Sequence, residues 1–398
     1  MTSRFVDLAK ARACVSIAPV TGPFDPPTFR LEEYLGVWEF SARHYLTASD
    51  AETLTIAELL AYADPDERAR FERLPLSYAP TWGGEELRAA IADLYEGLGP
   101  EHVLTFAGAE EALFWALQEL AGPGDHALVT VPNYQSFETI PLTAGAEVEG
   151  IVLDPAAGWE PDVEEIARRM RPTTKLVAVN FPNNPTGAIC SQEAWRALVE
   201  LCDEHGATLL SDEVYRGLET DGSRRLPQAA ELSGSAVSLN VMSKSYGLPG
   251  LRIGWLATRR RDLLERLERR KHYTSICNAT PSEALATIAL RNGAAIQRRN
   301  RDLIATNVPL FEAAFAAHPE HLEWQAPAGG CVSFPRYLGA DGVEAFCREL
   351  VETDGVVLLP ASIYASELGQ VPADRFRIGV GRRDPEAALA ALGRFLDS

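Results

Sequence analysis

The chain has 398 residues, and its 37 basic and 56 acidic side chains give a net charge of −19 with histidine neutral. This charge excludes binding to nucleic acid through a general basic field. A hydrophobic fraction of 46% excludes an intrinsically disordered chain. At about 150 residues per domain, the length predicts two or three domains, or one large layered domain with a smaller one.

The sequence shows no pattern typical of a membrane helix, a secretory signal or a metal site. No run of 18 apolar residues occurs, so we expect no transmembrane helix and no membrane partner. Residues 1–20 lack the continuous apolar core of a secretory signal. The six cysteines form no C-x-x-C pair and have no metal-like spacing with histidine. We therefore predict a cytoplasmic protein with reduced thiols and no bound metal.

Predicted strands alternate with predicted helices through most of the chain. A Pro- and Gly-rich arm at 19–27 precedes the first helix. Helices are predicted over 31–46, 85–98, 108–120, 193–205 and 262–273, and strands over 102–106, 126–131, 175–180, 208–211, 236–241 and 253–257. After a long helix from about 290, short strands are predicted at 331–334, 356–359 and 375–380, with a last helix from 385. This alternation predicts an α/β fold whose sheet is mainly parallel and lies between helices.

The change of pattern near residue 290 predicts the domain organisation. We expect an N-terminal arm and helix over 1–45, a large domain over 46–288 and a small α/β domain over 289–398. The arm should pack with the small domain. Polar residues follow three predicted strands of the large domain, where ligands bind in parallel sheets. They are Asn183, Asn184, Asp212, Tyr215, Ser243 and Lys244.

The most informative segment is Ser243–Gly254, with the sequence SKSYGLPGLRIG. A lysine that follows a strand in such a loop is partly buried, and burial lowers the pKa of its amine. An amine of that kind can form a Schiff base with an aldehyde. Arg252 offers a planar pair of donors suited to a phosphate. For a lone lysine, an ordinary surface loop would be the preferred interpretation, and we expect Lys10, Lys175 and Lys271 to be replaceable surface charges.

Two further segments carry polar groups at strand ends. Residues 180–187 (NFPNNPTG) form a tight loop in which an asparagine amide can donate to a phenolate oxygen or a carboxylate, although alone it is an ordinary turn. Residues 211–215 (SDEVY) place a carboxylate where it can pair with a protonated pyridine nitrogen, and a tyrosine where it can bond a ring oxygen. Alone, this aspartate would sooner be a helix N-cap.

Together and in this order, the three segments resemble the fold type I enzymes that use pyridoxal 5′-phosphate (PLP), in the class I/II aminotransferase family. The resemblance covers roughly residues 45–385 and implies the PLP-dependent transferase fold, with a large PLP-binding domain. It implies that Lys244 is the Schiff-base lysine and proton carrier, and that Asp212 keeps the pyridine nitrogen protonated. Asn184 and Tyr215 would bond the 3′ oxygen of the ring.

The same resemblance implies further contacts to the cofactor. Ser243 and Arg252 would contact the phosphate, as would the backbone N–H groups of Gly108, Ala109 and Glu110 at a helix start. The pair Glu110–Glu111 also fits a plain acidic first turn of a helix. Tyr134 matches the aromatic side chain that stacks on the ring. Tyr78 matches a tyrosine that reaches the phosphate of the partner subunit, which implies a homodimer with shared active sites.

For the substrate-binding side of the site, the resemblance implies fewer residues. Arg377 matches the arginine that binds the substrate carboxylate, with Arg375 as the competing candidate. Asn184 would also face the substrate. The loop 47–50, with Ser49 and Asp50, lies where relatives line the substrate pocket. One departure is Val241, because many relatives carry a serine or threonine there, so a hydroxyl contact to the phosphate is missing or supplied elsewhere.

Within the family, short stretches are similar to the capreomycidine synthase type of cyclase. They are 31–34, 47–54 with 57–59, 181–185, and 329–330 with 334–336. This resemblance implies loss of a β-hydroxyl from a hydroxylated arginine and attack of its guanidine on Cβ, as part of antibiotic biosynthesis. A guanidinium needs acidic partners, for which Asp50, Glu52 and Glu110 are candidates.

Two other functions compete with the cyclase. The motif residues serve equally in an ordinary aminotransferase that moves an amino group between an amino acid and a 2-oxo acid. A regulator that has lost catalysis is disfavoured, because Lys244, Asp212 and Arg252 are all present and no DNA-binding segment is appended.

Overall fold

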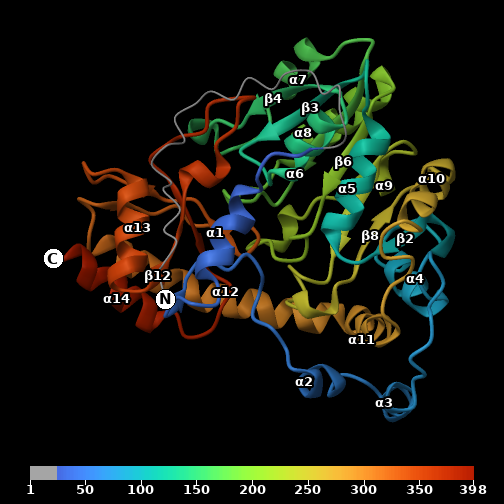
Figure 1. Ribbon diagram of the computed structural model, residues 1–398, viewed down its shortest axis with the longest axis horizontal. Coiled ribbons are helices and arrows are strands. Elements are labelled where there is room, and N and C mark those ends of the chain that lie inside the picture. Colours follow the sequence, from blue (N-terminus) through green and yellow to red (C-terminus); the bar gives the residue numbers. More distant parts are fainter. Residues whose placement is uncertain (1–24) are drawn as a thin grey trace.

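The computed structural model describes residues 25–398, and a seven-stranded sheet lies at its centre (Figure 1). Its order is β2-β8-β7-β6-β5-β3-β4. β8 runs antiparallel to both of its neighbours, and the other pairs are parallel. The predicted α/β fold with a mainly parallel mixed sheet is thus confirmed. The strands are β2 (Val103–Phe106), β3 (His126–Val131), β4 (Glu147–Val152), β5 (Thr174–Asn180), β6 (Thr208–Asp212), β7 (Val237–Val241) and β8 (Gly254–Ala257).

Helices cover both faces of this sheet, and the residues of β5 show how. Leu176 and Ala178 belong to the hydrophobic cluster that contains α5 (Ala109–Leu120) and α10 (Arg261–Lys271). Val177 and Val179 belong to the cluster that contains α8 (Gln192–His205). Successive side chains of a strand point to opposite faces, so an unbroken apolar run is what a strand covered on both sides requires.

Smaller elements flank the central sheet. Before β2 lie α2 (Ile56–Leu60), α3 (Pro65–Glu72) and α4 (Glu85–Ala92), and α11 (Thr280–Arg291) contacts all three. Other helices are α6 (Ser136–Thr143), α7 (Val163–Arg169) and α9 (Ala229–Leu232). Short 3-10 helices lie at η2 (Pro100–His102), η3 (Pro155–Ala157), η4 (Gly222–Arg224), η5 (Pro249–Leu251) and η6 (Ala361–Tyr364).

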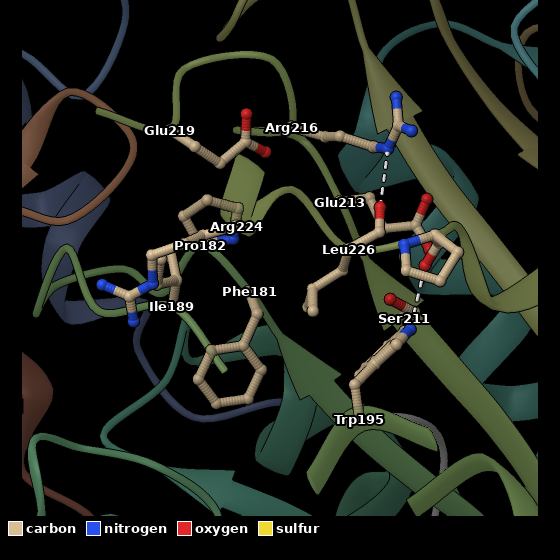
Figure 2. A pocket seen from close by; sticks show the side chains of 11 residues that line it. Phe181, Pro182, Ile189, Trp195, Ser211, Glu213, Arg216, Glu219, Arg224 and Leu226 are labelled. Atoms are coloured by element: carbon tan, nitrogen blue, oxygen red, sulfur yellow. Dashed lines mark hydrogen bonds between the residues drawn. The ribbon is translucent and has the colours of Figure 1, made fainter. Parts of the chain in front are cut away.

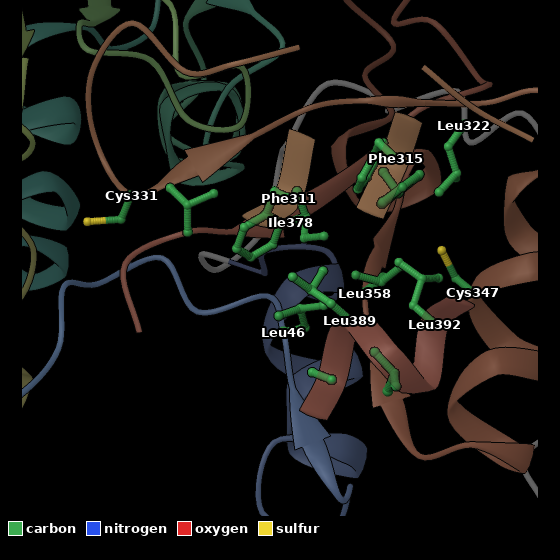
Figure 3. Close-up of a cluster of buried hydrophobic side chains, with 14 of the residues drawn as sticks. Leu46, Phe311, Phe315, Leu322, Cys331, Cys347, Leu358, Ile378, Leu389 and Leu392 are labelled. Carbon is green, nitrogen blue, oxygen red and sulfur yellow. The ribbon is translucent and has the colours of Figure 1, made fainter. Parts of the chain in front are cut away.

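One hydrophobic cluster is built mainly from the C-terminal part of the chain (Figure 3). The long helix α12 (Gly293–Ala316) contributes Phe311 and Phe315, and α14 (Glu386–Leu396) contributes Leu389 and Leu392. Leu46, far away in the sequence, packs in the same cluster. Three small sheets and α13 (Val343–Thr353) complete this part: β1 (His44–Tyr45) with β12 (Val356–Val357), β9 (Leu322–Glu323) with β11 (Arg336–Tyr337), and β10 (Val332–Ser333), β14 (Phe376–Gly379) and β13 (Leu359–Pro360).

Two polar side chains of α12 bind two loops that are far apart in the sequence. Asn300 and Asn307 are buried on this helix. The Nδ2 of Asn300 donates to the carbonyl of Ser245, which follows Lys244, at 2.9 Å. The Nδ2 of Asn307 donates to the carbonyls of Val380 at 2.8 Å and Arg382 at 2.7 Å. The long helix therefore touches both the large sheet's lysine loop and the C-terminal segment.

The N-terminal helix differs from its predicted extent. α1 spans Arg30–Trp38, whereas the spacing of apolar residues predicts a helix over 31–46. Tyr45 pairs in parallel with Val357, and the carbonyl of Leu46 accepts from the Gly379 N–H at 3.0 Å. Pairing with residues more than 300 positions away thus takes the backbone of 44–46 out of the helix. The domain boundaries at 45 and 288 stay a prediction.

Across residues 25–398, no helix is long and apolar enough to cross a membrane. The five cysteines in that range are free thiols, and Cys14 lies outside it. Among the same residues, no group of three histidine, cysteine or acidic side chains is arranged to hold a metal ion. The Pro- and Gly-rich arm and Lys10 fall largely or wholly in residues 1–24, outside the described range.

Candidate active site

Three neighbouring parallel strands bring the predicted polar residues to one edge of the sheet. In the pairing register, Asn180 of β5 lies beside Asp212 of β6, and Asp212 lies beside Leu239 of β7. Asn184 follows β5 by four residues, and Lys244 follows β7 by three. Because β5, β6 and β7 are adjacent, these three side chains lie at the carboxyl ends of the strands, where ligands bind in open α/β sheets.

Lys244 contacts the loop 47–50. Its Nζ donates to the Oγ of Ser49 at 2.8 Å. Burial lowers the pKa of this amine because desolvation disfavours its charged form, and the nearby Asp50 carboxylate opposes that effect. A lysine with a lowered pKa is more often a free amine, which is the form that attacks an aldehyde.

Asp212 is buried, with only 6% of its surface exposed. Its Oδ1 accepts from the backbone N–H of Val214 at 3.0 Å. Burial raises the pKa of this carboxyl to about 7, against the lowering effects of that hydrogen bond and of Lys244. A cation placed against the carboxyl would favour its ionised form, so Asp212 suits a protonated ring nitrogen.

The backbone at the start of α5 packs closely against Arg252 and Gly254. Gly108 precedes the helix with φ +97°, a conformation that favours glycine, and a Cβ there would lie 2.4 Å from Nη2 of Arg252. A Cβ on Gly254 would lie 2.7 Å from the backbone N of Ala109. The arginine thus lies directly against the N-terminus of a 12-residue helix, an arrangement that suits an anion. Ser243 is buried nearby in sequence, just before Lys244.

Tyr134 and Glu110 lie close to each other. Tyr134 is half-buried, and its ring lies 5.1 Å from that of Phe29. Burial raises the pKa of the Tyr134 phenol, and the Glu110 carboxylate raises it further. Glu110 accepts a hydrogen bond from Ser136 at 2.6 Å through Oε1.

Arg377 lies in a buried polar cluster, and Arg375 lies elsewhere. Nη1 of Arg377 donates to Oδ1 of Asn184 at 3.2 Å and to the Tyr364 hydroxyl at 2.7 Å, and Nη2 donates to the carbonyl of Thr47 at 2.9 Å. Arg375 instead donates to the carbonyl of Phe334 at 2.7 Å. Of the two arginines, Arg377 is therefore the one beside the Asn184 loop.

The loop 47–50 lies between the strand ends and the C-terminal part. The carbonyl of Ser49 accepts from the Tyr215 hydroxyl at 2.9 Å, while its Oγ contacts Lys244. Asp50 pairs with Arg382, with 2.7 Å between Oδ2 and Nη2. Through these contacts, Ser49 and Asp50 join the same group of side chains as Lys244.

Tyr78 is the predicted site residue that the single chain does not bring to this group. It is 89% exposed and lies between α3 and α4, among residues without regular secondary structure. Its predicted contact with a partner subunit's phosphate stays a prediction.

Two residues of the site were not predicted from the sequence. Tyr364 bonds Arg377 and also donates to Oδ1 of Asn184 at 3.3 Å, and Arg382 neutralises Asp50. Tyr364 lies 180 positions from Asn184, in a short segment with no motif around it. Only the folded chain reveals these contacts.

Asp212 and Glu213 are consecutive acids with different surroundings. Figure 2 shows Glu213 in a separate pocket, lined also by Phe181, Trp195 and Arg216. Its Oε1 accepts from the Ala229 N–H at 2.9 Å and from Ser238 at 2.8 Å. Burial raises the pKa of Glu213 to about 7. Oε1 of Glu213 is thus held by the protein's own donors, whereas its Oε2 is buried without a hydrogen-bond partner among the described residues.

The expectation that Lys271 is a replaceable surface charge is wrong. Its side chain is fully buried, and Nζ donates to the carbonyls of Thr81 and Thr105, each at 2.7 Å. Burial lowers the pKa of this amine to about 8. It joins the segment before α4 to β2, whereas Lys175 is exposed as expected.

Comparisons with known proteins agree with this geometry. The family model described as aminotransferase class I and II matches residues 57–395. The chain belongs to the class I and II aminotransferase family. It is 32% identical over 387 residues to capreomycidine synthase from Streptomyces vinaceus, covering 94% of this chain and 95% of that one.

Solved structures of related proteins have the same fold. A PLP-dependent aminotransferase from Streptococcus suis superposes with a TM-score of 0.87 at 31% identity, over 94% of this chain and 98% of that one. The PLP-dependent cyclase OrfR superposes with a TM-score of 0.85 at 29% identity, over 95% and 99%. The resemblance predicted from the three motif segments is confirmed at the level of the family, and the protein is an enzyme that uses PLP.

The residues at the sheet edge fit this cofactor. Lys244 offers an amine, Asp212 a buried carboxyl for the ring nitrogen, and Arg252 with the start of α5 an anion site. When bound, PLP delocalises the electrons left on Cα after that carbon loses a proton.

Proposed function

We propose that the enzyme cyclises a free arginine that carries a hydroxyl on Cβ, as a step in antibiotic biosynthesis. The observation that carries the proposal is the match to capreomycidine synthase over 94% of this chain and 95% of that relative. The superposition on the PLP-dependent cyclase OrfR over 95% of the chain supports it. A chain with 19 excess acidic charges is also compatible with a cationic substrate.

The side chains of the site divide the work of this reaction. Lys244 takes the proton from Cα and gives it to the β-hydroxyl, which leaves as water. A guanidine nitrogen then bonds to Cβ, and Lys244 carries to Cα the proton that this nitrogen gives up. The guanidine gives up one proton as its nitrogen bonds, so the net change is the loss of one water. Arg377 holds the α-carboxylate, because its planar guanidinium offers two parallel donors.

The other contacts with the cofactor are proposed in the same way. Asn184 and Tyr215 would face the 3′ oxygen of the ring, Tyr134 would stack on the ring, and Ser243 and Arg252 would hold the phosphate. We further propose a cytoplasmic homodimer in which the exposed Tyr78 reaches the phosphate of the partner subunit. This would give an 89% exposed tyrosine a polar partner that one chain does not supply.

A single incubation tests the cyclase. The PLP-loaded enzyme is incubated with β-hydroxyarginine in the absence of a 2-oxo acid, and the masses of the products are measured by mass spectrometry. We expect a product lighter by one water, formed over many turnovers. Arginine without the β-hydroxyl serves as the control and should lose no water. Turnover only when a 2-oxo acid is added, with build-up of the amine form of the cofactor, would contradict the cyclase.

The alternative is an aminotransferase acting between an amino acid and a 2-oxo acid. The superposition on the Streptococcus suis aminotransferase, with a TM-score of 0.87, is the observation that favours it. Lys244, Asp212 and Arg377 serve both reactions, so these residues do not separate them. The same incubation does, because only the aminotransferase needs a second substrate.

A further inference from the structure

Three acidic residues close to the candidate site, Asp50, Glu52 and Glu110, are candidates for a guanidinium partner, and two of them already have partners. Asp50 pairs with Arg382 at 2.7 Å. Oε2 of Glu52 accepts from the backbone N–H of Arg383 at 2.9 Å. The third, Glu110, accepts from Ser136 through Oε1. Burial raises the pKa of this carboxyl, and the hydroxyls of Ser136 and Tyr134 lower it. The Oε2 of Glu110 is buried and has no partner at hydrogen-bond geometry among the described residues. Glu110 alone of the three therefore has a buried, unfilled acceptor.

Glu110 lies at the predicted cofactor end of the site. It is the second residue of α5, which begins where Gly108 meets Arg252. Its charge acts on two residues of the site, since it raises the pKa of both Tyr134 and Asp212. None of the ion pairs formed within residues 25–398 includes Glu110. Glu32 of α1, an exposed residue, adds a second negative charge nearby.

An acidic first turn of a helix does not explain this arrangement. Glu111, the next residue, has the contacts expected of such a turn, because its Oε2 accepts from the Ala107 N–H at 2.7 Å and from Ser275 at 3.0 Å. A carboxylate at a helix start is stabilised by the helix dipole whether it is exposed or buried. A buried carboxylate oxygen without a donor is costly, by about 1–3 kcal/mol or more. A ligand that donates to Oε2 would remove that cost.

We propose that Glu110 binds the guanidinium of the substrate, accepting its N–H groups at the free Oε2. This rests on the proposed function, in that it assumes an arginine-type substrate in the Lys244 site. A guanidinium is planar and carries five N–H donors. It can therefore donate to Oε2 of Glu110 while Oε1 keeps its hydrogen bond from Ser136. Glu110 would then determine specificity for a cationic over a neutral side chain.

Binding to the PLP-loaded enzyme tests this without requiring cyclisation. Arginine and citrulline have nearly the same shape, but only arginine is charged. Each is titrated in turn while the visible spectrum of the cofactor is followed. We expect the wild type to bind arginine at least ~10-fold more tightly, and Glu110→Gln to weaken arginine by ~10- to 100-fold while citrulline changes by less than ~3-fold.

Matched variants separate charge recognition from structural damage. Glu52→Gln removes a competing acid and should leave the preference for arginine unchanged. Glu110→Asp keeps the charge and should retain part of the preference, which also covers the case in which Glu110→Gln does not fold. A wild type without preference, an unchanged preference in Glu110→Gln, or equal weakening of arginine and citrulline in that variant would overturn the assignment.

The two proposals fail in different ways. If the enzyme binds arginine through Glu110 but converts it only with a 2-oxo acid, the cyclase is wrong and Glu110 stands. If β-hydroxyarginine loses water while Glu110→Gln still prefers arginine to citrulline, the cyclase stands and the Glu110 assignment is wrong.

Discussion

The two halves of the candidate site are assembled by different means. The cofactor half comes from the ends of β5, β6 and β7, so Asn184, Asp212 and Lys244 are brought together by the regular geometry of one sheet. The substrate half is joined by bonds between residues far apart in the chain, such as Arg377 with Thr47 over 330 positions. The first half is therefore expected to be shared across the family, whereas the second can vary without disturbing the sheet.

Replacing the lysine of the cofactor half should have the largest effect. Lys244→Ala removes the amine that binds the cofactor and moves the Cα proton, so turnover should fall by at least ~10⁴-fold. The visible absorption of lysine-bound PLP should also disappear. Absorption spectra and rates are compared with Lys175→Ala, which removes an exposed lysine and should change neither. A retained band in Lys244→Ala would show that another lysine binds the cofactor.

In the substrate half, two arginines two residues apart should behave differently. Arg377→Lys loses the paired donors that a carboxylate needs, so KM should rise by ~10²-fold with a smaller effect on kcat. Arg375→Lys should leave KM within ~3-fold and act on stability, because Arg375 bonds the carbonyl of Phe334. Steady-state kinetics and thermal unfolding distinguish the two. If Arg375→Lys raises KM more than Arg377→Lys, the assignment is reversed.

The third effect concerns the pH dependence of stability rather than turnover, and it involves a carboxyl outside the candidate site. The pKa of Glu213 is about 7 in the folded protein, above its ordinary 4.5. The folded state therefore binds more protons than the unfolded state between these values, so stability falls as pH rises from about 4.5 to 7. Glu213→Gln should flatten this decline by up to roughly 3 kcal/mol.

Denaturant unfolding of the PLP-loaded protein at pH 5, 6, 7 and 8 measures that decline. The PLP-loaded form is chosen because a cation beside Asp212 would remove the similar contribution of that neighbouring carboxyl, whose pKa is also about 7 in the chain alone. An equal slope in the wild type and in Glu213→Gln would show that Glu213 is not the group that titrates.

The sequence predicted the cofactor half better than the substrate half for a physical reason. A strand followed by a polar loop is a local pattern, so the positions of Asp212 and Lys244 could be inferred from a few neighbouring residues. Tyr364 carries no such local pattern, because its partners are distant in the chain. The buried Lys271 was missed for the same reason, since its acceptors are the carbonyls of Thr81 and Thr105.

The N-terminal helix shows the limit of periodicity. Apolar residues at helical spacing predicted a helix through residue 46, yet α1 ends at Trp38. Pairing of β1 with β12 decides the conformation of residues 44–45, and that pairing depends on a strand near the other end of the chain. A local pattern contains no information about a partner so far away.

The long helix α12 contacts both the cofactor half and the substrate half of the site. Asn300 is bonded to the loop that carries Lys244, and Asn307 is bonded to the segment that follows Arg377. At a rise of 1.5 Å per residue, the seven-residue step from Asn300 to Asn307 spans about 10 Å, or two helical turns, so both amides leave the same side of the helix. One residue inserted between them would rotate the second amide by about 100° and break one of the two attachments. The interval between these two asparagines therefore links the position of the Lys244 loop to that of the segment after Arg377.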